Sequence, residues 1–349
     1  MEIIQLENYG HTAPPRAATR RIQRSTHRIR ASLVAVLEAC GAFEWVALSY
    51  LGLSGLLMIV FYRNLPRAAR LLTLHAGFGA AIVALVVSAR RAELANHCHR
   101  SWGRILQIAR DWYPQAVFLF CFEELGALVH LVRRGWSDSW LLAFDYRLVG
   151  AYPTVWLAQF ARPALTDFMQ FSYLTYFFFL TILAAVLYAR GSDSRLGEEL
   201  RHSAFWAVMT SSMAAYAIGY TISIFFPIQS PYFSLAALHL PPLRGGPFTR
   251  ASDQIEHFGR VHGGAFPSEH VAGSFVALLG ARRYRRKLFW MFLPFFVCMC
   301  VSTVYVRNHY IADVLGGIVT GAIGFQIGLW LMRLRGVNPE KYVSGHTAE

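Results

Sequence analysis

Long apolar runs, separated by short polar segments rich in arginine, dominate the pattern of residues along this chain. Each run approaches the length that a helix needs to cross the hydrocarbon layer of a membrane, which is about 20 residues. The eight runs cover about 43–62, 71–88, 113–132, 171–189, 203–227, a stretch that begins near His270, 288–306 and 309–332. The pattern therefore predicts an all-α fold, a polytopic membrane helical bundle with about eight transmembrane helices.

The polar segments divide the chain into four expected parts. These are an arginine-rich cytoplasmic tail (1–42), an N-terminal transmembrane hairpin with a surface segment (43–110), a membrane catalytic domain (111–332) and a second cytoplasmic tail (333–349). Within the third part, residues 133–170 predict a polar, partly amphipathic link, and residues 228–262, rich in Pro and Gly, predict a long loop.

Composition and charge support a membrane protein. Hydrophobic residues make up 55% of the chain and charged residues only 15%, against about 25% charged in an ordinary soluble domain. The formal net charge is +13, and Arg and Lys lie about twice as often on the side of the two termini as on the other side. By the positive-inside rule this bias predicts cytoplasmic termini, although the loop 63–70 runs against it. No basic stripe is interleaved with aromatics in a polar domain, so we do not expect nucleic-acid binding.

Two polar sequences near the C-terminal end carry the residues most suited to chemistry. The first, GGAFPSEH, ends at His270, and the second, STVYVRNHYIADVLGG, contains His309 and Asp313. If the two apolar runs between them are membrane helices, the chain leaves one membrane face at His270 and returns to it at His309. Asp313 follows His309 by four residues and shares its face of a helix. The spacing predicts two imidazoles and a carboxylate at one membrane surface.

This set of residues has the equipment for phosphoryl transfer. A neutral histidine is a nucleophile, a carboxylate on its other nitrogen orients it, and a second histidine can protonate the leaving oxygen. Ser268 and the N–H groups of a starting helix can hold phosphate oxygens, and Gly264 allows close approach of the backbone. No cofactor is needed for this chemistry. A metal site is the alternative, with His257 and His262 as nearby ligands, but the chain lacks a regular ligand spacing.

The same two sequences resemble motifs of the type 2 phosphatidic-acid phosphatase superfamily. GAFPSEHVAGS is similar to its PSGH-type motif, and STVYVRNHYIADVLGG is similar to its SR-x5-H-x3-D motif. Residues 143–177 look like the segment that precedes the catalytic core in the inositol phosphorylceramide synthase-like branch, so the resemblance covers about 110–332. It implies a six-helix phosphatase-like core preceded by about two extra spans.

The resemblance also implies roles for individual residues. His309 corresponds to the nucleophile, Asp313 to its orienting carboxylate and His270 to the general acid, while Ser268 corresponds to a phosphate ligand. Glu269 departs from the pattern, because the family usually has glycine there. A carboxylate would repel phosphate unless it is paired or protonated, so Glu269 could select a cationic headgroup or hold an arginine.

Two arginines that usually clamp phosphate in this superfamily are absent. Thr303 stands at the position of the arginine in the third motif, and Tyr232 stands near the position of the arginine in the first. Arg260 and Arg307 are the closest possible substitutes in sequence. Loss of all these clamps would make a weak phosphatase or a relative without catalytic activity.

These observations predict an integral membrane enzyme that hydrolyses a membrane lipid phosphate through a phosphohistidine, without a metal. Its expected location is a bacterial inner (plasma) membrane, with the active site facing the periplasm or the outside. Two alternatives stay open: transfer of a phospho-headgroup to a lipid acceptor, as in inositol phosphorylceramide synthase, and lipid binding or transport without catalysis. The sequence leaves the lipid, the acceptor and the oligomeric state open.

Overall fold

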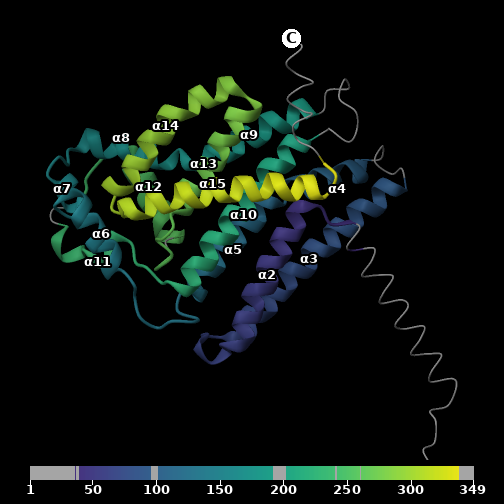
Figure 1. The fold of residues 1–349 in the computed structure, drawn as a ribbon, viewed down its shortest axis with the longest axis horizontal. Coiled ribbons are helices and arrows are strands. Elements are labelled where there is room, and N and C mark those ends of the chain that lie inside the picture. Colours follow the sequence, from purple (N-terminus) through teal and green to yellow (C-terminus); the bar gives the residue numbers. More distant parts are fainter. Residues whose placement is uncertain are drawn as a thin grey trace, which may run out of the picture.

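The computed structural model describes residues 36, 39–95, 101–191, 202–239, 242–259 and 261–337, and this part of the chain consists of helices joined by loops, without a strand (Figure 1). The prediction of an all-α fold is confirmed. Arg260 and the two terminal tails lie outside these residues, apart from positions next to the first and last helices.

Six helices are long and apolar enough to cross a membrane within the described residues. They are α2 (Ala42–Val60), α3 (Ala68–Leu94), the nearly continuous α8 (Pro163–Leu174) and α9 (Tyr176–Gly191), α10 (Ser203–Phe225), α14 (Arg286–Tyr305) and α15 (Ile311–Leu334). Each corresponds to one of the apolar runs, so the prediction of a polytopic bundle holds for these six.

The two remaining apolar runs also form helices, but shorter ones. Helix α5 (Pro114–Leu128) has 15 residues and α13 (Glu269–Tyr284) has 16, which at 1.5 Å per residue gives only about 22–24 Å. Pro114 starts α5, and the side chain of Ser268 caps α13 at its first turn. Helix α13 is the more enclosed of the two, since 11 of its residues are buried, against seven in α5.

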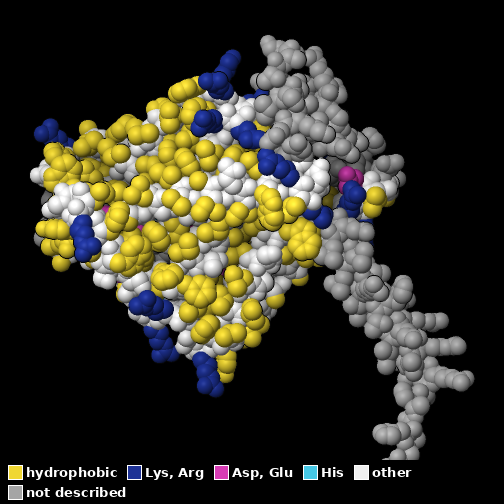
Figure 2. Space-filling view, viewed as in Figure 1, with side chains coloured by type: hydrophobic (Ala, Val, Ile, Leu, Met, Phe, Trp, Pro, Cys, Tyr) yellow, Lys and Arg dark blue, Asp and Glu magenta, His cyan; other side chains and the backbone are white. Residues whose placement is uncertain are grey.

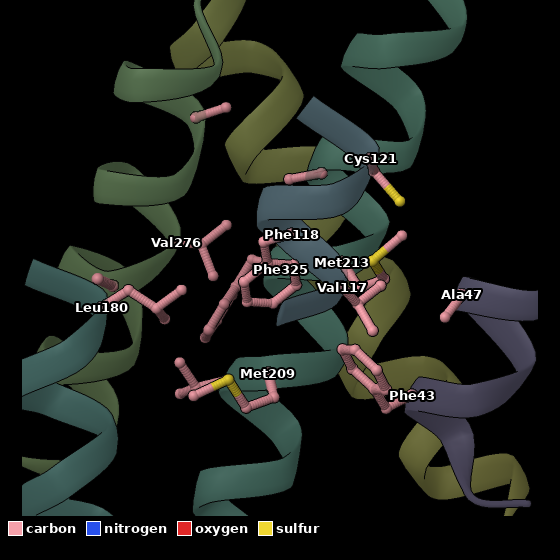
Figure 3. Packing of buried hydrophobic residues seen from close by; sticks show 14 of the residues in the cluster. Phe43, Ala47, Val117, Phe118, Cys121, Leu180, Met209, Met213, Val276 and Phe325 are labelled. Atoms are coloured by element: carbon pink, nitrogen blue, oxygen red, sulfur yellow. The ribbon is translucent and has the colours of Figure 1, made fainter. Parts of the chain in front are cut away.

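The centre of the bundle is formed by α10, α13 and α15, which pack against one another. Small residues bring these helices close together: a Cβ atom on Gly324 of α15 would lie 2.5 Å from the backbone nitrogen of Ala215 on α10. In a membrane, such close packing stabilises helix contacts more than burial from water does. Figure 3 shows Phe118 of α5, Met213 of α10 and Phe325 of α15 in this interior, and all three belong to one hydrophobic cluster.

Short helices gather near the end of the bundle where α15 begins (Figure 1). They are α6 (Ser139–Val149), α7 (Pro153–Ala158), α11 (Pro231–Ser234), the 3-10 helix η4 (Ala236–Leu238) and α12 (Pro247–Gly259). The expectation of an irregular loop over 228–262 is therefore wrong in part. Pro231 and Pro247 each occupy the first position of a helix, where proline is well tolerated because its missing N–H has no intrahelical partner.

The surface agrees with a membrane environment. Figure 2 shows hydrophobic side chains over most of the middle of one face, with Lys and Arg near its edges. Large apolar side chains such as those of Trp290, Val319 and Leu56 are more than half exposed. The remaining elements are the 3-10 helix η1 (Tyr62–Asn64), between α2 and α3, and α4 (Ser101–Trp112), which precedes α5.

Candidate functional site

His309 lies in the short connection between α14 and α15, at the end of the bundle surrounded by the short helices. The carbonyl of Thr303 accepts hydrogen bonds from the N–H groups of both Asn308 and His309, at 3.1 Å each. Arg307 adopts a positive φ of 71°, which lets the chain reverse direction after α14. These contacts hold the imidazole of His309, which is only 4% exposed, at the start of α15.

The contacts of the two ring nitrogens determine the tautomer of His309. Its Nδ1 lies 3.0 Å from the carbonyl oxygen of Ala265 and 3.3 Å from Oδ2 of Asp313. A carbonyl oxygen can only accept, so Nδ1 carries the hydrogen. Nε2 therefore presents a lone pair, and it faces Oγ of Ser268 at 3.1 Å and Nδ1 of His270 at 3.2 Å.

Burial keeps this imidazole neutral. His309 lies in a loop outside the spanning helices, and its removal from water lowers its pKa to about 4, although the hydrogen bond to Ala265 acts in the opposite direction. The charged form is penalised because few water molecules can solvate it. Near neutral pH the side chain therefore has the lone pair that a nucleophile requires.

Backbone contacts join the two motifs into one unit. Ser268 is fully buried and caps α13, since its Oγ accepts a hydrogen bond from the N–H of Val271 at 3.4 Å. The N–H of Ser268 donates in turn to the carbonyl of Asp313 at 3.0 Å. The start of α13 consequently lies beside His309, and the N-terminal end of a helix favours an anion.

Two carboxylates hold the first turn of α15, directly after His309. Oδ2 of Asp313 accepts from the N–H of Tyr310 at 2.8 Å. Asp145, which comes from α6, accepts from the N–H groups of Ile311 and Ala312 at 2.9 and 3.1 Å. Sequence reasoning missed Asp145, because nothing local in the chain links it to a helix that begins 166 residues later.

We expect replacement of Asp145 by alanine to reduce both stability and turnover. The change leaves two N–H groups at the start of α15 without their partner, which costs about 1–2 kcal/mol for a lost cap. A small displacement of His309 would lower kcat by about 10- to 100-fold. Thermal unfolding in detergent and steady-state kinetics would measure the two effects.

The control for this change is Asp138→Ala. Asp138 is also buried, and its Oδ1 accepts from the N–H of Gln229 at 2.7 Å. We expect that variant to lose stability with a smaller fall in kcat, and Asp145→Asn, which keeps one acceptor oxygen, to recover part of the rate. Equal falls in kcat for Asp145→Ala and Asp138→Ala at matched folded fractions would argue against a positioning role for Asp145.

A second residue missed from the sequence is Tyr173 on α8. Its hydroxyl lies 3.1 Å from Nε2 of His270, and the ring of Tyr176 lies edge-on to that imidazole, with 4.4 Å between centroids. One consistent arrangement has Tyr173 donating to His270 and His270 donating to Nε2 of His309. The contacts then form a line from Tyr173 through both histidines to Asp313.

A cavity of about 100 Å³ opens beside the two histidines. Glu269 and Glu256 line it together with the aromatic side chains of Tyr173 and Tyr176. Gly264, which has a positive φ of 71°, also borders the cavity, and a Cβ atom there would lie 3.0 Å from the side chain of Leu125. The backbone at this point can therefore come close to a ligand only because the residue is glycine.

Four of the residues proposed from the sequence line this cavity, namely Gly264, Glu269, His270 and His309. Ser268 and Asp313 lie behind them, where both contact the ring of His309. Arg307 does not join them as a lining residue: its Nη1 lies 3.4 Å from the carbonyl of His239. Arg260, the other proposed phosphate ligand, lies outside the described residues.

The alternative metal ligands do not form a cluster in the part of the chain that the structure describes. His262 packs against Phe233 and Trp136, with ring centroids 4.2 and 5.2 Å away. No group of three or more His, Cys, Asp and Glu side chains able to hold a metal ion occurs among the described residues.

Comparison with known proteins gives two matches. A family model described as the PAP2 superfamily matches residues 139–327, which is more than half of the chain. A PA-phosphatase related-family protein of Dictyostelium discoideum is 24% identical over 165 residues, which cover 44% of this chain and only 30% of that relative. No solved structure matches the chain significantly.

Proposed function

The chain belongs to the PAP2 superfamily, and from this membership and the geometry of the site we propose that it is a membrane enzyme that cleaves a phosphate ester of a lipid. The observation that carries the proposal is the lone pair on Nε2 of His309, which faces Ser268 and His270 beside the cavity. This membership confirms the family resemblance seen in the motifs.

In the first step, Nε2 of His309 attacks the phosphorus atom. An N–P bond forms while the bond from phosphorus to the ester oxygen of the lipid breaks. His270, which we expect to become protonated only when the negative charge of the phosphate lies beside it, gives its proton to that leaving oxygen. The hydrogen bonds from Nδ1 of His309 to Ala265 and Asp313 support this step, because the ring gains positive charge as the N–P bond forms.

In the second step, water attacks the phosphohistidine and His270 accepts the proton of that water. The N–P bond breaks, phosphate leaves and His309 returns to its neutral form. In both steps the hydroxyl of Ser268 and the N–H groups at the start of α13 would donate to phosphate oxygens. These steps use protein groups alone, so we expect a chelator such as EDTA to leave the rate unchanged.

Phosphate release from lipids in detergent micelles tests the proposal. The substrates would be phosphatidic acid, a polyprenyl diphosphate and a sphingolipid headgroup donor, each with EDTA present. Release from at least one lipid would support the phosphatase, and its absence with every donor would oppose it. Comparing right-side-out with inside-out vesicles checks the proposed outer membrane face, where the first orientation should be active with lipid added outside.

A phosphotransferase is the second candidate, because His309 and Asp313 are almost completely buried. A phosphohistidine in such a site has limited access to water, which favours a lipid hydroxyl as the acceptor. Transfer of a headgroup to an added lipid alcohol, without release of free phosphate, would favour this reaction over hydrolysis.

The pKa of His309 leads to a prediction about pH. Because burial lowers it from 6.5 to about 4, the nucleophile stays neutral as the pH falls through 6. We expect the acid limb of kcat/KM to lie well below pH 6.5. An acid limb of kcat/KM that lies at or above pH 6.5 and reports the titration of His309 would contradict this prediction.

The same shift affects stability. Below pH 6.5 the unfolded chain binds a proton at this histidine and the folded chain does not, so stability decreases as the pH falls from 6.5 toward 4. Thermal unfolding across this range should show a smaller decrease for His309→Ala than for the wild type.

A further inference from the structure

We propose that the cavity recognises a positive charge next to the phosphate, so that the substrate is a lipid containing a 2-aminoethyl phosphate ester. This inference rests on the proposed function and names the class of lipid that the site takes. It is carried by the acidic and aromatic side chains on the wall of the cavity beside the two histidines.

Glu269 is the first of these side chains. It precedes His270 directly, is only 6% exposed and lines the cavity. Its side-chain hydrogen-bond partner is Oγ of Ser223 at 3.5 Å, and that hydroxyl lies closer to the carbonyl oxygen of Phe266, at 3.1 Å. A hydroxyl has one hydrogen to donate, so the bond to Glu269 is weak at best.

A buried carboxylate needs a stronger partner than this. Because a charged group is costly to keep out of water without a counter-charge, burial raises the pKa of Glu269 to about 8, and the side chain stays protonated near neutral pH unless a positive charge lies beside it. Among the described residues, no Arg or Lys forms an ion pair with Glu269. An ammonium group of a bound lipid would supply the missing positive charge.

The aromatic side chains around Glu269 fit the same ligand. Phe122, Tyr173 and Tyr176 line the cavity, and Tyr173 and Tyr176 both contact His270. Aromatic rings attract ammonium groups through their negative faces, and quaternary ammonium ions are commonly held in this way. Glu256 of α12 adds a second carboxylate to the wall, where its Oε1 accepts from Nδ2 of Asn308 at 2.8 Å.

The lining of the cavity thus combines two kinds of group. The histidines and the nearby start of α13 can interact with a phosphate. Glu269, Glu256 and the tyrosines can interact with a cation. A phosphate and an ammonium joined by a two-carbon link would satisfy both kinds of group at once, whereas phosphatidic acid would bring only negative charge to the two carboxylates.

Two kinds of lipid contain a 2-aminoethyl phosphate ester. In a phospholipid with an ethanolamine or choline headgroup the ammonium lies on the headgroup side. Attack by His309 would then break the bond from phosphorus to the diacylglycerol oxygen, which His270 protonates, and water would release phosphoethanolamine or phosphocholine. In the phosphate of a long-chain amino alcohol the ammonium lies on the lipid side, and the same steps release the amino alcohol and inorganic phosphate.

The main experiment compares wild type with Glu269→Gln on these lipids and on phosphatidic acid. We expect the wild type to favour an ammonium-containing lipid over phosphatidic acid by about tenfold or more in kcat/KM. The variant should lose that preference, with a lower value for the ammonium lipid and a higher value for phosphatidic acid. The product, phosphoethanolamine or inorganic phosphate, tells which of the two kinds of lipid is used.

A structural role for Glu269 would lower the rates for all lipids together, and that result would overturn the proposal. Glu123→Gln serves as the matched control, because Glu123 is an exposed carboxylate of α5 that does not line the cavity. We expect Glu123→Gln to keep the wild-type ratio of kcat/KM for the ammonium-containing lipid to kcat/KM for phosphatidic acid. A wild type that prefers phosphatidic acid would also overturn the proposal.

A binding experiment separates this inference from the proposed function. Phosphoethanolamine and glycerol phosphate can be titrated against wild type, His309→Ala and Glu269→Gln. Tighter binding of phosphoethanolamine that depends on Glu269, without turnover of any lipid, would support the inference and oppose the enzyme. Turnover of lipids with equal binding of both probes would support the enzyme and overturn the inference.

Discussion

Replacing His309 with alanine is expected to reduce lipid phosphate cleavage by about a thousandfold or more, because the side chain that forms the covalent bond is lost. Nε2 of His309 has no substitute in position: His270 faces it at 3.2 Å, and the second nitrogen of His270 contacts the hydroxyl of Tyr173. The steady-state rate and the amount of trapped phosphohistidine would both be measured.

The matched control is His239→Ala. His239 is 6% exposed, against 4% for His309, and its Nε2 bonds to Oγ1 of Thr154. It therefore tests whether loss of any buried imidazole near this end of the bundle is enough to stop the reaction. We expect it to retain most of the rate per folded molecule. A His309→Ala protein that is folded and still forms acid-labile phosphoprotein would show that another group is the nucleophile.

The second large effect is expected for Asp313→Asn, with a fall in kcat of about 10²- to 10⁴-fold. Asp313 is completely buried, and its Oδ2 accepts from both His309 and the N–H of Tyr310. Its Oδ1 has no hydrogen-bond partner among the described residues, so the amide nitrogen of an asparagine of the same shape could take that position without breaking a hydrogen bond. The substitution removes the charge that stabilises a cationic His309 and keeps the cap of α15.

This variant should fold nearly as well as the wild type, which thermal unfolding would check. A change in kcat with little change in KM is expected, because the charge of Asp313 matters most when His309 becomes positive. Full activity in Asp313→Asn would mean that the carbonyl of Ala265, 3.0 Å from Nδ1, orients the ring by itself. A protein that fails to fold would instead assign the carboxylate to capping, and Asp313→Glu would then separate the two roles.

Much of the site could be predicted from sequence because its main residues are tied together locally. Asp313 follows His309 by one helical turn, and Ser268 precedes His270 by two residues at a helix start. The length of the apolar runs between them returns the chain to the same end of the bundle. Spacing of this kind does not depend on how the helices pack, so it can be recognised without a structure.

Other members of the site depend on contacts between distant parts of the chain. Tyr173 contacts His270 across 97 residues, and Asp145 caps α15 across 166. Neither belongs to a pattern that spacing could indicate, because the neighbours of each were set by how α6, α8 and α15 pack. The same packing aims the guanidinium of Arg307 toward the carbonyl of His239, although the sequence places it only two residues before His309.

The sequence by itself determined an all-α membrane protein and the set of two histidines, a serine and a carboxylate, because apolar run length and helical period are local properties of the chain. Only the tertiary structure decided which ring nitrogen of His309 carries the lone pair, which carboxylate supports α15, and that Glu269 and two tyrosines line the same cavity. Those features depend on the distances between helices, which follow from close packing of residues such as Gly324 and Ala215. These distances cannot be read from the order of apolar and polar residues along the chain.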